Sequence, residues 1–218
     1  MRGGIFMATY IIIAIIAYAI GSINFSVIIS KKMAGFDIRE KGSGNAGSTN
    51  MLRSIGKKAA ILTLVCDILK GVVAVLIAVI VGKIVKNVDK AALVQIAGIL
   101  VVIGHTFPIF FEFKGGKGVA TSLGVLLMIN WKIGLICLVF ALVIMALGRI
   151  VSLGSVGAAI LCPVLTLFIH SHYIVEATGM KYLAFGSILA AIVIFNHRAN
   201  IQRIVNGTES KLSFKNKA

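Results

Sequence analysis

Residues 58–82, KAAILTLVCDILKGVVAVLIAVIVG, decide the fold class. This run of 25 residues carries only three charged side chains, Lys58, Asp67 and Lys70. An α-helix rises about 1.5 Å per residue, so about 20 apolar residues cross the hydrocarbon core of a bilayer. Because lipid offers no hydrogen-bond partners to the backbone, a spanning run of this kind must be helical. We therefore predict a transmembrane helix here.

Further apolar runs have the same character. They cover residues 5–30, 91–111, 119–130, 133–148, 156–170 and 181–196. The first run lacks an A-x-A cleavage site and continues to Ser30, so we expect a spanning helix and not a signal peptide. The sequence predicts an all-α integral membrane protein, with a single domain over residues 1–218 and about seven transmembrane helices. Five or six is the alternative, because residues 119–148 also fit one long helix.

The composition of the whole chain supports this class. Hydrophobic residues make up 59% of the 218 residues and charged residues 13%, whereas soluble domains have roughly 45–50% and about 25%. This excludes a soluble enzyme and a nucleic-acid-binding module with a solvated surface, although the net charge is +15. Cys66, Cys137 and Cys162 stand alone in apolar runs, so neither a metal site nor a disulfide framework is expected.

Basic residues are divided unevenly between the two ends of the predicted helices. Fifteen of the 22 Lys and Arg residues fall in segments 31–58, 112–118, 149–155 and 197–218, which seven crossings place on one side. Six fall on the other side, and Lys70 lies within a helix. Because Lys and Arg accumulate in cytoplasmic loops, we expect the N-terminus outside and the C-terminus in the cytoplasm. The same alternation puts every glycine-rich motif on the cytoplasmic side.

The first polar motif is residues 41–53, KGSGNAGSTNMLR, which we call the first glycine loop. Its glycines let backbone N–H groups approach a ligand, and its Ser, Thr and Asn residues add short donors. Arg53 adds a planar fork suited to phosphate. The loop lacks the Walker A pattern, and a flexible connection is the alternative interpretation. The residues expected to contact substrate are Ser43, Gly44, Asn45, Gly47, Thr49, Asn50 and Arg53.

The second motif is residues 113–121, FKGGKGVAT, which we call the second glycine loop. A basic, glycine-rich turn that opens a helix predicts an anion site, because the helix N-terminus carries about half a positive charge. A tight turn that obeys the positive-inside rule is the alternative. The expected contacts are Lys114, Gly115, Gly116, Lys117 and Gly118. We expect Glu112 to form a structural pair with a nearby basic residue.

The third motif is residues 197–209, HRANIQRIVNGTE, which we call the C-terminal segment. If the last helix continues beyond the bilayer, His197, Asn200 and Ile204 share one face. His197 and Asn200 would then lie at headgroup depth, where we expect them to act on substrate with Glu209 nearby. The alternative is a set of ordinary interfacial side chains.

Two weaker signals lie elsewhere. Ser152 and Ser155 follow Arg149 at a predicted helix junction, where they could bind phosphate or cap the next helix. The sequence leaves both possibilities open. Asp67 and Lys70 are spaced i, i+3 within a predicted transmembrane helix, and intramembrane charges usually pair. We expect a structural or site-supporting ion pair.

SGNAGSTNMLR, FKGGKGVAT and HRANIQRIVNGTE, in this order and on one membrane face, resemble the motifs of the bacterial acyl-phosphate:glycerol-3-phosphate acyltransferase family, PlsY. The resemblance runs from GSINFS at residue 21 to GTE at residue 207, which is nearly the whole chain. It implies seven helices with an active site at the cytoplasmic surface of the bacterial inner membrane. It also implies transfer of an acyl group from acyl-phosphate to the 1-hydroxyl of glycerol 3-phosphate. The products would be lysophosphatidic acid and inorganic phosphate.

The resemblance also implies roles for individual residues. Ser43 and Arg53 would be essential phosphate contacts, and the second glycine loop would cradle glycerol 3-phosphate or the acyl-phosphate headgroup. His197 and Asn200 would line the reaction centre, with His197 either a base or a positioning group. Glu209 would brace the C-terminal segment. No cofactor, metal or nucleic acid is expected, and the enzyme would work as a monomer among membrane lipids.

Two other functions compete with this interpretation. An anion or phosphate-ester transporter would also carry basic loops, but transporters often show internal repeats and polar sites at mid-depth, and neither is found here. A structural protein that binds anionic lipid would explain the charge but not the Gly, Ser, Asn and His content of the motifs. An HxxxxD pair, typical of the acyl-CoA-dependent class, is also missing. The fifth residue after His105 is Phe110 and the fifth after His197 is Gln202, and neither is an aspartate.

Overall fold

The structure, a computed structural model, describes residues 2–171, 176 and 178–211, with side chains from residue 7 onward. Over these residues it contains ten α-helices and two short 3-10 helices, η1 (Ile38–Glu40) and η2 (Ile109–Phe111). The prediction of an all-helical protein is confirmed for this part of the chain.

Six spans within the described residues are long and apolar enough to cross a membrane. The helices that form them are α1 (Arg2–Gly21) with α2 (Phe25–Ala34), α4 (Lys57–Ile84), α5 (Lys90–Thr106), α7 (Trp131–Gly148), α8 (Val151–Phe168) and α9 (Gly179–Asn196). The remaining apolar helix, α6 (Val119–Ile129), has 11 residues. At about 1.5 Å per residue it reaches only about half-way through a bilayer core. The seventh crossing therefore stays a prediction.

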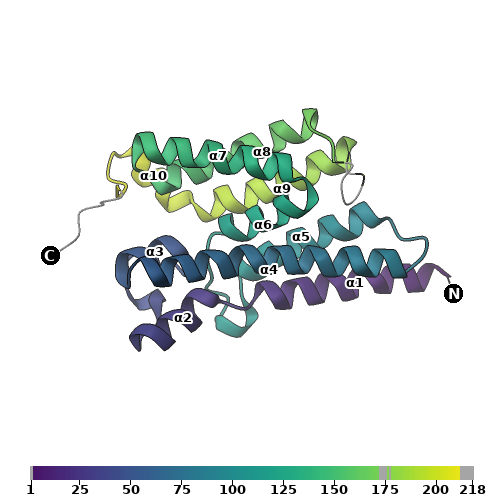
Figure 1. The fold of residues 1–218 in the computed structure, drawn as a ribbon, viewed down its shortest axis with the longest axis horizontal. Coiled ribbons are helices and arrows are strands. Elements are labelled where there is room, and N and C mark those ends of the chain that lie inside the picture. Colours follow the sequence, from purple (N-terminus) through teal and green to yellow (C-terminus); the bar gives the residue numbers. More distant parts are fainter. Residues whose placement is uncertain (1, 172–175, 177, 212–218) are drawn as a thin grey trace.

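The helices form a bundle with its polar elements gathered at one end. In Figure 1, α1, α4 and α5 lie on one side and α7, α8 and α9 on the other, with α6 between them. Two short helices, α3 (Ser48–Ser54) and α10 (Arg198–Val205), lie at the same end as α2, opposite the start of α1, with α3 near α2 and α10 beside α8 and α9. We call this the polar end of the bundle.

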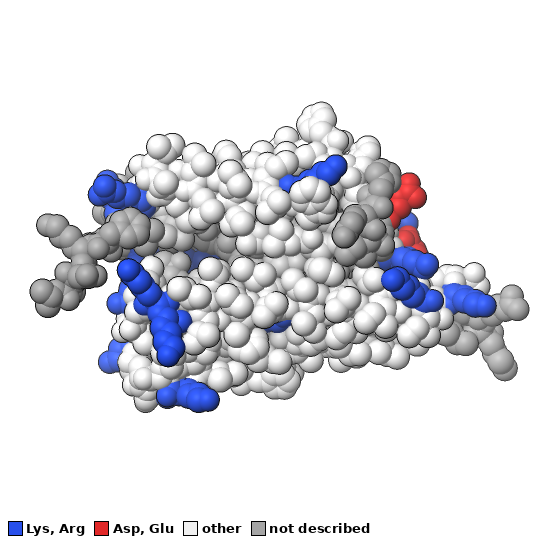
Figure 2. Space-filling view, viewed as in Figure 1, with Lys and Arg blue, Asp and Glu red and all other residues white. Residues whose placement is uncertain are grey.

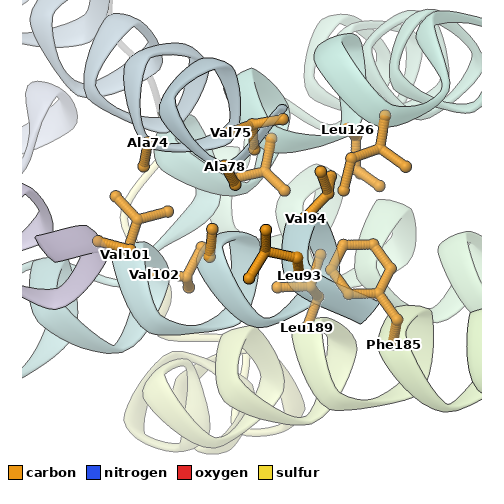
Figure 3. Packing of buried hydrophobic residues seen from close by; sticks show 14 of the residues in the cluster. Ala74, Val75, Ala78, Leu93, Val94, Val101, Val102, Leu126, Phe185 and Leu189 are labelled. Atoms are coloured by element: carbon orange, nitrogen blue, oxygen red, sulfur yellow. The ribbon is translucent and has the colours of Figure 1, made fainter. Parts of the chain in front are cut away.

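The hydrophobic core is centred on α5, which packs against α1, α4 and α9. Its side chains Leu93, Val94 and Val101 are fully buried. Figure 3 shows them beside residues of α4, with Phe185 and Leu189 of α9 close to Val94. Because α5 is covered on several faces, it joins the two sides of the bundle.

The expected single helix over residues 5–30 is wrong, because the chain breaks between α1 and α2. Asn24 ends the run by capping α2, where its side chain accepts a hydrogen bond from the backbone of Val27 (3.3 Å). Polar Ser22 and Asn24 inside an apolar run favour such a break. The carbonyl groups freed at Gly21 and Ile23 accept hydrogen bonds from Lys70, each at 3.0 Å.

Other boundaries also differ from the expected ones. Residues 119–148 form two helices, as expected, and not the one long helix of the alternative, and Asn130 caps the second of them. Helix α8 begins at Val151 and not at residue 156, so Ser152 and Ser155 lie within its first turns. The last helix does not continue straight on, because α9 ends at Asn196 and α10 begins after His197.

Charge is concentrated at the two ends of the molecule. The face in Figure 2 shows Lys and Arg side chains at both ends, with a broad and nearly uncharged belt between them. At the end opposite the polar end, Asp89 binds Lys181 (3.0 Å) and accepts a hydrogen bond at its backbone carbonyl from Tyr10 (3.4 Å). Lys215, Lys217 and the side chain of Arg2, which entered the count of basic residues, lie outside the described part.

Candidate functional site

A cavity of about 840 Å³ opens at the polar end, within the range of small-molecule sites. All three polar motifs contribute to its lining, together with the first turns of α8. The predicted site residues that line it are Ser43, Gly44, Asn45, Gly47, Thr49, Asn50, Arg53, Gly115, Lys117, Gly118, Ser152, Ser155, His197, Asn200 and Glu209. The structure thus brings together residues that are up to 166 positions apart in the chain. Lys114 and Gly116 do not line it.

The first glycine loop is held by one buried amide. Asn50 is 1% exposed, and its side-chain oxygen accepts a hydrogen bond from the backbone of Ser43 at 3.0 Å. Its amide nitrogen donates to the carbonyl groups of Ile38, Lys41 and Asn45 at 2.9–3.1 Å. These bonds hold Asn50 against the loop backbone, so it shapes the loop from inside. Gly42, at φ 58°, packs against the same amide and leaves no room for a Cβ.

Arg53 stands at the last turn of α3 and faces the cavity. In the described part of the chain its guanidinium makes one hydrogen bond, from Nη2 to the carbonyl of Ser210 at 3.4 Å. A guanidinium has five N–H donors. Most of the donors of Arg53 are therefore open to a ligand.

The second glycine loop lies against the end of α5. The N–H groups of Gly115 and Gly116 donate to the carbonyls of Thr106 and His105, both at 3.1 Å. A Cβ at Gly116 would overlap the His105 ring and the Ala46 carbonyl, so the residue must be glycine for packing and not for ligand access.

The two lysines of this loop separate. Lys117 enters the cavity, where its ammonium donates to Oδ1 of Asn200. Lys114 points away, is 73% exposed and lies 3.5 Å from Glu112. The expected pairing of Glu112 is thus found, while the structure places Lys114 outside the site predicted for it.

The C-terminal segment forms a compact network around Glu209. One carboxylate oxygen accepts hydrogen bonds from Ser152 (2.7 Å) and Asn200 (2.5 Å), and the other accepts one from Arg203 (2.6 Å). Asn200 also accepts the bond from Lys117, so the network joins the second glycine loop, α8 and α10. Ser155 instead donates to the backbone of Val151 in its own helix (3.1 Å).

Electrostatics at the mouth of the cavity shift three pKa values. Burial lowers the pKa of Lys117 to about 8, with the charges of Arg203 and Arg53 acting in the same direction. Burial, with the charge of Lys117, lowers the pKa of His197 to about 4. Burial would raise the pKa of Glu209, but hydrogen bonds from Ser152, Asn200 and Arg203 lower it below the usual range.

His197 is therefore neutral near pH 7. Its Nδ1 lies 2.7 Å from the carbonyl oxygen of Val193, so the ring donates from this nitrogen. The other ring nitrogen, Nε2, is then an acceptor. His197 is 3% exposed and lines the cavity. It can accept a hydrogen bond from a substrate hydroxyl.

Several residues that line the cavity were not among the substrate contacts predicted from the sequence. Asp67 of α4 and His105 of α5 reach it from the inner side, and Nδ1 of His105 lies 3.5 Å from the Asp67 carboxylate. Arg203 and Asn196 line it at the outer side. The charge of Asp67 inside an apolar run was the available signal, and nothing in the sequence showed that His105 would meet it.

The part of the cavity between α6, α7, α8 and α9 is mostly apolar. Behind the polar mouth, α6, α7, α8 and α9 contribute Leu, Ala, Val, Met and Cys side chains. We call this part the apolar slot. Among the described residues there is no group of three or more His, Cys, Asp or Glu side chains that could hold a metal ion.

Comparison with known proteins gives a consistent result. A family model described as glycerol-3-phosphate acyltransferase matches residues 11–207. The chain is 45% identical to a glycerol-3-phosphate acyltransferase of Clostridioides difficile (strain 630), over 95% of this chain and 97% of the relative. It is 44% identical to one of Thermoanaerobacter sp. (strain X514), over 94% and 96%.

Solved structures agree with the sequence relatives. The glycerol 3-phosphate form of PlsY, an integral membrane glycerol 3-phosphate acyltransferase, is similar with a TM-score of 0.82 and 36% identity, covering 94% of this chain and 96% of that one. Its lysophosphatidic acid form is similar with a TM-score of 0.80 and 35% identity, covering 94% and 95%.

Proposed function

The chain belongs to the glycerol-3-phosphate acyltransferase family, and from this premise we propose that it takes its acyl group from acyl-phosphate. The acyl group would pass to the 1-hydroxyl of glycerol 3-phosphate, giving lysophosphatidic acid and inorganic phosphate. Family membership decides against the transporter and the lipid-binding structural protein. It leaves the donor open, because the relatives described above are not identified by their acyl donor.

One observation carries the choice of donor: the polar mouth and the apolar slot are parts of the same cavity. The mouth holds Arg53 and Lys117, the cations that two phosphate groups need, and the slot suits an acyl chain that enters from the membrane. A small headgroup fits this arrangement well. Acyl-phosphate offers a single phosphate beside the reacting carbonyl, whereas acyl-CoA would bring a large nucleotide to the same place.

The chemistry needs no covalent intermediate. The 1-hydroxyl oxygen attacks the acyl carbonyl carbon and forms the new ester bond. The bond from that carbon to the phosphate oxygen breaks, and phosphate leaves with the electron pair. The hydroxyl proton passes to a phosphate oxygen. His197 donates to a backbone carbonyl and not to a carboxylate, so it differs from the oriented histidine of a Ser-His-Asp triad.

The protein then contributes positioning and charge stabilisation. Ser43, Arg53 and Lys117 hold the two phosphates, supported by the backbone N–H groups of the first glycine loop. Asn200 and His197 face the reacting hydroxyl. A base with a pKa of about 4 is weak at pH 7, whereas phosphate esters titrate near pH 6. We therefore assign the proton to phosphate and a positioning role to His197.

The proposal extends to membrane placement. The N-terminus lies outside and the C-terminus in the cytoplasm of the bacterial inner membrane, with α6 as the seventh crossing and the cavity mouth facing the cytoplasm. Single cysteines at Lys41, Lys114 and Lys211 in a background without Cys66, Cys137 and Cys162 test this. A membrane-impermeant thiol reagent should label them only in broken cells. Labelling of any one of them in intact cells would contradict the proposed topology.

Phosphate release by the purified protein tests the donor. Palmitoyl-phosphate with glycerol 3-phosphate should release phosphate and form lysophosphatidic acid in equal amounts, and omission of glycerol 3-phosphate should stop both. Palmitoyl-CoA and palmitoyl-acyl carrier protein should give no product. Comparable turnover with palmitoyl-CoA would contradict the donor assignment while leaving the family assignment intact.

A further inference from the structure

The lining of the apolar slot ends on four helices. In each helix, the cavity-lining residue farthest from the polar mouth is Leu126 in α6, Cys137 in α7, Cys162 in α8 and Leu189 in α9. Helices α6 and α8 run away from the mouth and α7 and α9 run toward it, so these four positions mark the inner end of the lining, and all four belong to one buried hydrophobic cluster. We call them the floor of the slot.

Beyond the floor the bundle is closed. One turn farther from the mouth lie Ile129 in α6, Ile133 in α7, Thr166 in α8 and Phe185 in α9, each at most 1% exposed. None of these four residues lines the cavity. Figure 3 shows Phe185 beside Leu189, facing α5. An acyl chain that fills the slot therefore meets packed side chains and cannot pass through.

The depth of the slot matches a membrane acyl chain. Ser152 at the mouth and Cys162 at the floor are ten residues apart on α8, which is about 15 Å of helix. Each leaflet contributes half of the bilayer's hydrocarbon core of about 30 Å, also about 15 Å. The slot thus has room for one chain of the length found in the bilayer.

Two small side chains form half of the floor. Cys137 of α7 and Cys162 of α8 are 6% and 3% exposed, and these two helices pack against each other. Cys137 also lies 3.7 Å from the Ala158 carbonyl. Cysteine behaves as a small apolar side chain in such a place. A larger residue at either position would move the floor toward the mouth.

We propose that Cys137 and Cys162, with Leu126 and Leu189, set the longest acyl chain that this enzyme accepts. The floor limits the length of the acyl chain, because the acyl carbonyl must reach the phosphate sites at the mouth while the methyl end of the chain stops at the floor. This inference rests on the proposed function for its occupant, a fatty acyl chain. It adds a length limit and the residues that impose it.

The test changes the floor in both directions. Cys162→Leu raises the floor, and Leu189→Ala lowers it. Cys66→Leu is the matched control, because Cys66 is a partly exposed residue of α4 outside the cavity. The measurement is kcat/KM for saturated acyl-phosphates from decanoyl to stearoyl, together with KM for glycerol 3-phosphate.

Cys162→Leu should shift the preferred donor to a shorter chain, and Leu189→Ala to a longer one. Each methylene that no longer fits should cost about fourfold in kcat/KM, from about 0.8 kcal/mol of lost burial. The KM for glycerol 3-phosphate should stay within about twofold, and Cys66→Leu should keep the wild-type profile. If Cys162→Leu fails to fold, Leu189→Ala alone decides the question through its shift to longer donors.

Other outcomes would overturn the proposal. If Leu189→Ala keeps the wild-type chain-length profile, or if Cys162→Leu and Cys66→Leu give the same profile, the floor does not measure the chain. If the wild type uses only acyl-CoA, the proposed donor is wrong, and the same length series of acyl-CoA thioesters then tests the floor. The two failures are therefore distinguishable.

Discussion

Lys70 and Lys117 are both withdrawn from water, but their ammonium groups are used in different ways. Lys70 is 3% exposed within α4. It donates to the carbonyls of Gly21 and Ile23, each at 3.0 Å, and lies 3.1 Å from the Asp67 carboxylate. Two of the three donors of the ammonium are therefore used on backbone carbonyls, and its charge is paired with Asp67. Lys70 closes the break between α1 and α2.

Lys117 has one hydrogen-bond partner within the described residues, Asn200, and its other donors face the cavity. Charge inside a membrane protein does not by itself mark a binding site. The difference lies in whether the donors are already taken by the protein. We expect substitution of Lys70 to cost stability, and substitution of Lys117 to cost activity.

The largest expected effect is on the stability of a Lys70→Met variant. Removing one partner of a buried ion pair leaves Asp67 uncompensated, which typically costs about 3–5 kcal/mol. The melting temperature in detergent should fall sharply, while kcat/KM per folded molecule stays near that of the wild type. Lys32→Met, at an exposed position on α2, is the control and should melt like the wild type. If Lys70→Met melts at the wild-type temperature, Lys70 has no structural role.

Lys117→Met should reverse this pattern. Charge-assisted hydrogen bonds contribute about 1.5–3 kcal/mol each, so loss of two should reduce kcat/KM by at least about 100-fold. The melting temperature should change little, because Lys117 is only partly buried. Phosphate release and thermal unfolding on one preparation measure both. A stable variant with full activity would show that Lys117 does not hold substrate.

The pKa of Lys117 adds a pH dependence. At about 8, the ammonium is charged below that pH and loses its proton above it, so kcat/KM should fall as pH rises through 8. Lys117→Arg should abolish this fall, since a guanidinium keeps its proton. Persistence of the same fall in an active Lys117→Arg enzyme would assign it to another group.

Arg53→Lys should have a smaller effect. Arginine can hold a phosphate through two parallel hydrogen bonds, and lysine cannot reproduce this fork. The expected loss in kcat/KM is at least about tenfold, equivalent to about 1.4 kcal/mol. Arg149→Lys is the control, because Arg149 does not line the cavity. Equal activity of both variants with the wild type would exclude a bidentate contact.

His197→Gln should have the smallest effect. Loss of one neutral hydrogen bond costs about 0.5–1.5 kcal/mol, or up to about tenfold. Because burial lowers the pKa of His197 to about 4, its protonation occurs well below neutral pH. The acid limb of the rate profile above pH 5.5 should be unchanged in the variant. An inactive but folded variant, or loss of a limb near pH 6.5, would make His197 the base.

The sequence predicted the helical membrane class and the three polar motifs, because hydrophobic length and glycine-rich composition are local signals. It could not predict which side chains of a motif face inward. Asn50 turns its amide into its own loop, and Lys114 points away while Lys117 enters the cavity. The direction of Lys117 depends on Asn200 of α10, which is 83 residues away in the chain. The break at Asn24 depends likewise on Lys70.

One measurement tests the comparison most directly: phosphate release at equal amounts of folded protein by the wild type, Lys117→Met and Lys70→Met. Lys70 does not line the cavity. We predict near-wild-type kcat/KM for Lys70→Met and a loss of at least about 100-fold for Lys117→Met. Full activity of Lys117→Met together with an inactive, folded Lys70→Met would contradict the account.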